Sequence, residues 1–361
     1  MERLTPLPWQ SALWQQVTAA RERLPHALLL HGMRGIGKRQ FMRALAQLLL
    51  CECGGKGGFA CGECPGCQLF AAGNHPDLRW LIPEADLPVR ADSESGDGTA
   101  PGAEAKSSRR RAILIDQVRE LGEFLTLASH RGGRRVVLLA PAEALNGPAA
   151  NALLKVLEEP PAGVVFLAIS DELDAVLPTV LSRCVLLRAP MPDTESALNW
   201  LQSSGVDDAE MRLAESGGAP LAAARAEEGS EGRDLTAELK ERLLQALGKG
   251  GRLQLADVVS VVPRDVPVAA AIRLFQRWGW DLLAERTAGR LRYYPQRKRT
   301  IAIVARGCDP ESVLAWLSQL NEGQAVAEHP LNPRLVIESA LIGYMKAVEP
   351  KSAASQGRTT A

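Results

Sequence analysis

One short stretch constrains the fold of this chain more than any other. "HALLLHGMRGIGKRQ" begins as an apolar run typical of a buried strand, continues as a Gly-x4-Gly-Lys pattern at Gly32, Gly37 and Lys38, and leads into a helical pattern. A strand, a glycine-rich turn and a helix in this order are typical of a phosphate-binding loop, because the backbone N–H groups of the turn and of the helix N-terminus create an anion site. The stretch therefore predicts an α/β domain built around such a loop.

Two further apolar runs predict more strands of the same sheet. "RRVVLLA" (134–140) and "GVVFLAIS" (163–170) have the length and composition of buried strands. "PAANALLKVLEE" between them reads as a helix that Pro160 and Pro161 end. Strands that alternate with helices indicate a parallel sheet with crossover helices.

The rest of the chain predicts smaller helical domains and polar segments. Segment 84–111 is polar and ends in the basic run Arg109 to Arg111; we interpret it as a mobile surface loop, with a functional basic patch as the alternative. "EEGSEGR" marks a linker, and beyond it Trp278, Trp280, Leu282 and Leu283 predict the core of a helical bundle. We expect an α/β domain, a short helical block, a longer helical domain and a disordered tail, at 1–189, 190–228, 229–348 and 349–361.

Composition narrows the class of protein. The 361 residues are 46% hydrophobic and 23% charged, which is ordinary for a soluble globular protein. No apolar run is long enough to cross a membrane and no secretory signal is visible, so we expect a cytoplasmic protein without a membrane partner. Lys plus Arg and Asp plus Glu both number 42. This balance argues against a protein that is stably bound along nucleic acid.

The phosphate-binding loop lacks the groups that hold magnesium. In active enzymes a Ser or Thr that ligates Mg²⁺ follows the lysine, but here the next residue is Arg39, whose guanidinium has no acceptor. The strand ending at residue 139 is followed by Ala140 and Pro141, where an Asp-Glu pair is expected, and Glu143 comes too late. We therefore expect the loop to fold and stay empty. Passive nucleotide binding stays open, and an active ATPase with a variant magnesium site is the alternative function.

A cluster of cysteines predicts a metal site. Cys61, Cys64 and Cys67 supply three thiolates, and Cys51 or Cys53 supplies a fourth, as in closed structural Zn²⁺ sites. An iron–sulfur cluster and free buried thiols are the alternatives, although the fourth cysteine lies upstream, unlike a ferredoxin-type run. A further hypothesis is a zinc-dependent nucleic-acid reader. The zero net charge and the scarcity of aromatic residues near the cluster speak against it.

These motifs together resemble a known family. "PHALLLHGMRGIGK", the cysteine cluster, "NHPDL", "NALLKVLEEPP" and "LSRC" follow one another as in bacterial replicative clamp-loader subunits of the AAA+ class. The resemblance spans essentially the whole chain, more weakly after about residue 200, and the last two motifs are quite specific. The group contains ATPase subunits and one inactive relative. Arg39, Ala140 and Pro141, which replace the magnesium-binding residues, match the inactive relative. Pro220 also matches it, because it stands where the ATPases carry a sensor arginine.

The resemblance implies a fold, partners and site residues. It implies an AAA+ domain, a three-helix lid and a collar that joins a hetero-pentamer of ATPase subunits and delta, which loads a sliding clamp on primed DNA as part of a replicative DNA polymerase assembly. The zinc module is an insertion after the phosphate-loop helix, with Cys51 as the fourth ligand and Cys53 as a spare. Arg183 would be an arginine finger that reaches ATP in a neighbouring subunit, so ATP and Mg²⁺ are expected only there.

Overall fold

The computed structural model describes residues 3–55, 57–86, 112–126, 129–131, 133–225, 235–263, 266–326 and 333–349. The proposed mobile loop from residue 87 on, with its basic run at Arg109 to Arg111, lies outside these residues, as does the tail beyond residue 349. The chain divides into two compact units, Met1–Ser196 and Ala197–Ala361.

The first unit is built on a parallel sheet of five strands in the order β2-β3-β4-β1-β5. In chain order these are β1 (Ala27–His31), β2 (Leu78–Leu81), β3 (Arg135–Leu139), β4 (Val164–Ser170) and β5 (Val185–Arg188). The three central strands are the three apolar runs predicted from the sequence, so the parallel α/β fold is confirmed. The two edge strands have four residues each and half-exposed positions, and their patterns are too short to identify them from the sequence.

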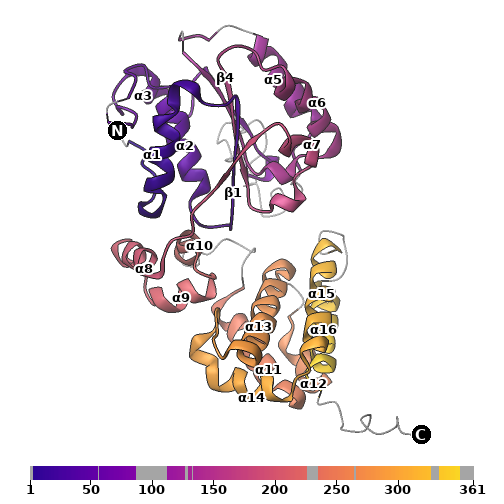
Figure 1. The fold of residues 1–361 in the computed structure, drawn as a ribbon. Helices are drawn as coiled ribbons and strands as arrows, with labels where there is room; N and C mark the ends of the chain where they lie inside the picture. Colours follow the sequence, from indigo (N-terminus) through magenta and orange to yellow (C-terminus); the bar gives the residue numbers. More distant parts are fainter. Residues whose placement is uncertain are drawn as a thin grey trace, which may run out of the picture. The chain divides into compact units, whose positions relative to one another are not determined.

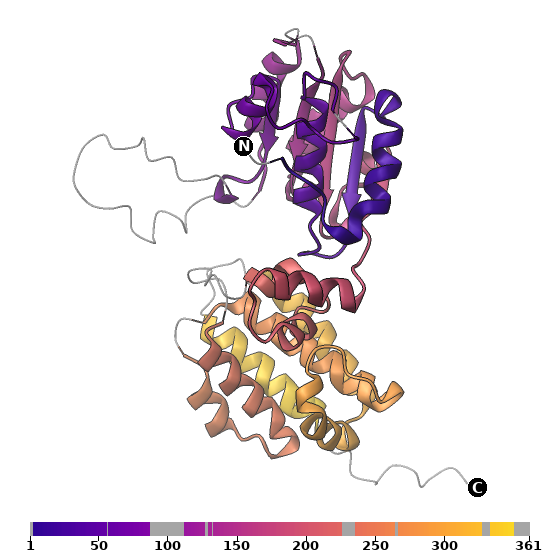
Figure 2. The ribbon, with the colours of Figure 1, turned by 90° about the vertical axis from the view of Figure 1, so that its left-hand side faces the viewer.

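Helices cover both faces of this sheet (Figures 1 and 2). Along one face lie α1 (Ser11–Ala19), α2 (Lys38–Leu49) and α3 (Pro65–Ala71), and along the other lie α5 (Ile115–Thr126), α6 (Gly147–Glu158) and α7 (Pro178–Leu181). The amphipathic α2 buries Phe41, Leu45 and Leu48 completely or nearly so. The side-chain oxygen of Asn146 accepts the Ala149 N–H at 2.8 Å and caps α6.

The parallel direction of the strands positions the candidate site. Because all carboxyl ends of parallel strands meet at one edge of the sheet, the segments that follow β1, β3 and β4 are neighbours there. The glycine-rich loop follows β1, Ala140 and Pro141 follow β3, and Asp171 follows β4. Segments more than 100 residues apart in sequence therefore converge on one site.

All secondary-structure elements that the structure describes in the second unit are helices, as expected for the C-terminal part. Three short helices share a small apolar core formed by Ala197, Leu201, Val206, Ala209, Leu213 and Ala223: these helices are α8 (Thr194–Ser203), α9 (Ala209–Glu215) and α10 (Pro220–Arg225). The larger core gathers residues of α11 (Ala237–Gly248), α12 (Leu255–Val261), α13 (Val268–Ala288), α14 (Lys298–Gly307), α15 (Pro310–Val326) and α16 (Pro333–Ala347). The expected boundary between lid and collar falls at residues outside the described ranges and stays a prediction.

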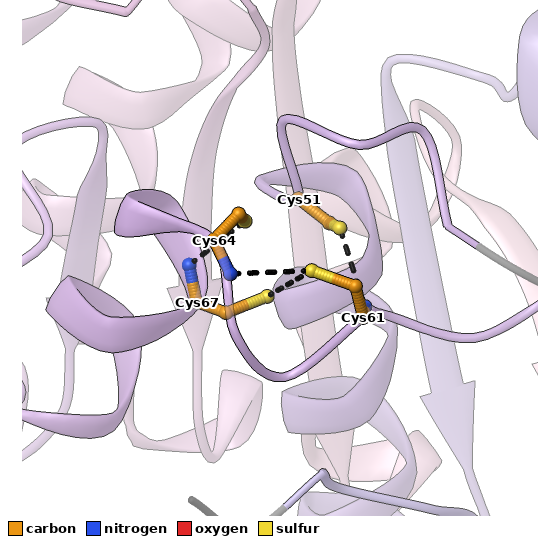
Figure 3. A group of neighbouring side chains, drawn as sticks. All are labelled: Cys51, Cys61, Cys64 and Cys67. Atoms are coloured by element: carbon orange, nitrogen blue, oxygen red, sulfur yellow. Dashed lines mark hydrogen bonds between the residues drawn. The ribbon is translucent and has the colours of Figure 1, made fainter.

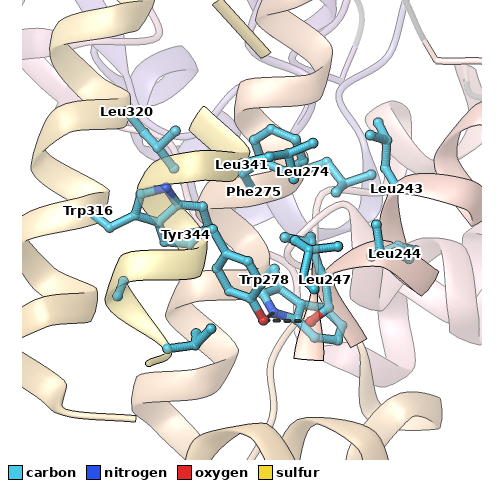
Figure 4. Close-up of a cluster of buried hydrophobic side chains, with 14 of the residues drawn as sticks. Leu243, Leu244, Leu247, Leu274, Phe275, Trp278, Trp316, Leu320, Leu341 and Tyr344 are labelled. Atoms are coloured by element: carbon cyan, nitrogen blue, oxygen red, sulfur yellow. Dashed lines mark hydrogen bonds between the residues drawn. The ribbon is translucent and has the colours of Figure 1, made fainter. Parts of the chain in front are cut away.

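Aromatic side chains organise the larger core (Figure 4). Tyr344 of α16 donates its hydroxyl to the Leu247 carbonyl at 2.6 Å and accepts the Trp278 indole N–H at 3.1 Å, which joins three helices. Trp278 is buried as predicted, but Trp280 is 55% exposed, so its assignment to the core was wrong. Two residues apart on a helix means a rotation of about 200°, which turns the second indole to the opposite face.

No helix among the described residues combines the length and the apolar character needed to cross a membrane.

Candidate functional site

The glycine-rich loop has the shape of a phosphate-binding loop. It connects β1 to α2, and Gly32, Gly35 and Gly37 all have positive φ angles, of 148°, 84° and 93°. A side chain at Gly37 would be blocked, since a Cβ there would lie 2.2 Å from Leu7 Cδ1. The loop therefore needs glycine both for its backbone conformation and for close packing.

The ammonium group of Lys38 is bound by the protein itself. Its side chain is only 3% exposed and contacts Asp171 Oδ1 at 2.6 Å. The same Nζ donates to the carbonyl oxygens of Gly32 and Met33 at 2.5 and 2.7 Å. An ammonium has three N–H donors, and these three partners use all of them. The lysine that would meet a phosphate is thus occupied within the chain.

Asp171 is a site residue that the sequence reasoning missed. It follows the last residue of β4, is 31% exposed, and also lies 3.9 Å from Arg34 Nε. It belongs to no motif, and its approach to Lys38 depends on β4 lying next to β1 in the sheet. The one available signal was a carboxylate directly after a buried strand, at the sheet edge where the loop begins.

The N-terminal segment covers the loop from another side. The side chains of Trp9 and Gln10 both donate to the Ile36 carbonyl at 3.0 Å, and Gln10 is completely buried. Leu7 packs against Gly37, and Gln47 of α2 accepts the Leu4 N–H. These bonds tie the segment to the loop and to the helix that follows it.

Among the residues that the structure describes, no magnesium ligand stands where an active enzyme would need one. Arg39 is half-exposed and lies 3.9 Å from Asp86. Ala140 and Pro141 follow β3 without a carboxylate, as the sequence indicated. Glu143 Oε1 instead accepts hydrogen bonds from the backbone N–H groups of Asp171 and Glu172 at 2.9 and 3.3 Å. These bonds hold the segment after β4 in place.

Four cysteines converge in a second site (Figure 3). The Sγ atoms of Cys51, Cys61, Cys64 and Cys67 all lie within 4.8 Å of one another. Four sulfur atoms at 2.3 Å from one tetrahedral ion lie about 3.8 Å apart, so a small closing movement would let this cluster hold a metal. Cys53 is exposed and stands outside the cluster. The choice between Cys51 and Cys53 as the fourth ligand thus falls on Cys51 in this structure.

Backbone N–H groups face three sulfurs of this cluster, whereas burial raises the pKa of the Cys67 thiol. The N–H groups of Cys61, Cys64 and Cys67 point at the sulfurs of Cys51, Cys61 and Cys64 at 3.3, 3.3 and 3.4 Å. Hydrogen bonds from the backbone N–H groups of Glu63 and Cys64 lower the pKa of the Cys61 thiol to about 6. A hydrogen bond with Cys61 raises the pKa of the Cys53 thiol to about 11. A deprotonated Cys61 is ready to ligate a metal, whereas Cys53 keeps its proton.

The cysteine module is tied to the sheet by polar contacts. Glu52 forms an ion pair with Arg131, just ahead of β3. Asp77, from the "NHPDL" motif, is buried and accepts the His130 N–H at 2.9 Å and the Ser129 hydroxyl at 3.1 Å. The motif thus anchors the segment that the module contacts, which is a structural reason for its place beside the cysteines.

Arg183 lies between α7 and β5, and its guanidinium is folded back on the chain. Nη2 pairs with Glu158 Oε1 at the end of α6, and Nη1 donates to the Thr179 carbonyl at 2.8 Å and to the Ser182 hydroxyl at 3.1 Å. The side chain is 29% exposed and that of Glu158 is 50% exposed. Pro220, at the position expected for a sensor arginine, is buried and begins α10.

Comparison with known proteins agrees with the arrangement of these motifs. Residues 9–192 match the family model described as DNA polymerase III, delta subunit. The chain is 36% identical to DNA polymerase III subunit delta' of Pseudomonas aeruginosa, over 93% of this chain and 96% of that protein. It is 36% identical to the Yersinia pestis delta' subunit, over 77% and 75% of the two chains, and 34% identical to that of Escherichia coli K12, over 66% and 65%.

Proposed function

The chain belongs to the family of DNA polymerase III delta' subunits, and on that premise we propose that it is a non-hydrolysing stator of the bacterial replicative clamp loader. In this role it joins ATPase subunits and a delta subunit in a hetero-pentamer. The assembly uses ATP to load a sliding clamp on primed DNA, and ATP and Mg²⁺ are held by the neighbouring subunits. A cytoplasmic location follows from this role.

One observation carries the non-hydrolysing part of the proposal. Every N–H of the Lys38 ammonium is used by Gly32, Met33 and Asp171, so the group that would neutralise a γ-phosphate is already neutralised. Phosphoryl transfer depends on positioning and on charge neutralisation, to which the metal contributes much. A loop with a paired lysine, and with no magnesium ligand beside it in the described part of the chain, supports a scaffold role for the site.

In this proposal Arg183 provides positive charge and N–H donors to the phosphates of an ATP bound by a neighbouring subunit. A guanidinium offers two parallel N–H donors to phosphate oxygens and stays charged at any physiological pH. Supplied in trans, it stabilises the charge that develops on the transferred phosphoryl group. Its position in the "LSRC" motif and at the partly exposed surface of the first unit supports this assignment.

For the cysteine cluster we propose a structural Zn²⁺ ion held by Cys51, Cys61, Cys64 and Cys67. Four thiolates leave no open coordination position, which is typical of sites that fold a module and not of catalytic sites. The lowered pKa of the Cys61 thiol and the N–H groups aimed at the sulfurs fit such a ligand set.

The test is reconstitution of the loader with the ATPase and delta subunits of the same organism. We expect the purified chain to show no ATP hydrolysis, and Arg183→Ala to leave assembly intact while it lowers the ATPase of the complex. A trans arginine is worth about 10³-fold or more at the site it serves, and total turnover falls by less because other sites keep their own arginines. Arg119→Ala, a change at an exposed arginine of α5, is the matched control.

Two results would contradict the proposal in different ways. Normal ATPase in the Arg183→Ala complex would remove the finger role. ATP hydrolysis by the chain alone, lost on Lys38→Ala, would establish the alternative of an active ATPase with a variant magnesium site.

A further inference from the structure

The two motifs most specific to this chain meet in one ion pair. Glu158 is the first glutamate of "NALLKVLEEPP" and ends α6, whereas Arg183 belongs to "LSRC", 25 residues later. Helices α6 and α7 pack together, and the Glu158 carboxylate contacts Nη2 of the Arg183 guanidinium.

The guanidinium is not free to bind a phosphate in this arrangement. Arginine has five N–H donors. Two donors on Nη1 serve Thr179 and Ser182, one on Nη2 serves Glu158, and Nε is buried without a hydrogen-bond partner among the described residues. A bidentate contact with phosphate oxygens needs two parallel donors, so at least one of these bonds must break first.

The pair is of a kind that breaks easily. Glu158 is 50% exposed and Arg183 is 29% exposed. Surface ion pairs contribute about 0–1 kcal/mol where water reaches the carboxylate and solvates the separated charges, as it does at Glu158. A phosphate that carries more than one negative charge can therefore displace the carboxylate, which then returns to water at little cost.

We propose that Glu158 is a positioning residue that restrains Arg183 by competing with the neighbouring subunit's nucleotide phosphate for its guanidinium. This inference rests on the proposed finger role of Arg183 and adds a second residue that acts through it. In the free subunit the carboxylate holds the arginine against its own domain. In the assembled loader the guanidinium moves from carboxylate to phosphate, and the strength of the Glu158 pair determines how readily it does so.

The experiment measures ATP hydrolysis by the reconstituted loader with Glu158→Gln, which keeps the shape of the side chain and removes its charge. At the site that Arg183 serves we expect kcat/KM for ATP to rise about two- to fivefold, the range that corresponds to a surface pair of up to about 1 kcal/mol. The total rate of the loader should rise by less, because the other sites keep their own arginines. The gain should shrink as ionic strength rises, because salt already screens the pair. Glu159→Gln removes the same charge from the adjacent exposed position and should behave as wild type.

The double variant separates this inference from the proposed function. Glu158→Gln should have no effect in an Arg183→Ala complex, because the carboxylate acts only through the arginine. An unchanged or lowered kcat/KM in Glu158→Gln, with Arg183→Ala still impaired, would overturn the restraint and leave the finger standing. If Arg183→Ala itself has full activity, the finger role fails first. Thermal unfolding of each variant shows whether the chain still folds.

Discussion

At the scale of single residues, the loop retains its shape while its chemistry has changed. Gly32, Gly37 and Lys38 keep the backbone and charge of a phosphate-binding loop, but Asp171 lies where it neutralises the lysine. An internal carboxylate can take the place of a phosphate because both present oxygen acceptors to the same ammonium. The loop therefore keeps its conformation while the charge of Lys38 is paired within the chain.

This arrangement predicts that Asp171→Ala will let the loop bind nucleotide. Loss of the carboxylate frees one N–H of Lys38 and removes a negative charge that repels phosphate. A unit charge about 4 Å away contributes about 4 kcal/mol at an effective dielectric constant of 20 before salt screening, so we expect a gain in ADP affinity of about tenfold or more. Isothermal titration calorimetry with and without Mg²⁺ checks this, and Mg²⁺ should not strengthen the binding, because Arg39, Ala140 and Pro141 offer the ion no side-chain ligand.

Asp174→Ala is the matched control for this prediction. Asp174 is an exposed carboxylate three residues further along, and its removal changes the net charge of the chain equally. Equal ADP affinity in the two variants would mean that Asp171 does not prevent nucleotide binding at the loop.

At the scale of elements, the local spacing of the cysteines places the sulfur atoms of the cysteine module. Cys64 caps α3 and Cys67 lies in its first turn, so the Cys-x2-Cys spacing places two sulfurs on one side of a helix start. Cys51 comes just after α2, and Cys61 lies in the loop between the helices. A module of this size has little apolar core of its own, and a bound metal would supply the missing stability.

We predict that a single ligand substitution removes the metal, whereas the spare cysteine does not matter. Cys64→Ser should lower zinc content from about one ion per chain to almost none, and Cys53→Ser should leave it unchanged, because only the former Sγ lies in the cluster. Elemental analysis of the purified variants measures this. Equal zinc loss in both would show that Cys53 is a ligand, and iron in the wild type would favour the iron–sulfur alternative.

At the scale of the whole molecule, the balance of charges limits how strongly the isolated chain binds DNA. Its formal net charge is zero, so no general attraction draws it to DNA. The contacts that a clamp loader makes with primed DNA must then come chiefly from the assembled complex, in the role proposed here.

We therefore predict that the isolated chain binds primed DNA too weakly to detect at physiological salt, with Kd above about 10⁻⁴ M. Fluorescence anisotropy with a labelled primer–template measures the affinity, and chelation of the metal should not alter it. Tight, salt-dependent binding that disappears with the metal would revive the hypothesis of a zinc-dependent nucleic-acid reader.

The sequence alone determined the features that depend on neighbours along the chain. The three central strands, the helices α2 and α6, the phosphate loop with its defects and the set of cysteines are all readable, because strand and helix periods and ligand spacings are local. Local patterns failed at the short edge strands and at Trp280, whose burial depends on which face of α13 meets its neighbours.

Only the tertiary structure decided how the charged side chains are paired. Lys38 meets Asp171 because β4 lies beside β1 in the sheet, and Arg183 meets Glu158 because α6 packs on α7. No sequence spacing encodes these contacts, since each joins segments that are brought together by burial of the apolar residues between them. Charge pairing across a fold follows from packing, and packing is a property of the whole unit.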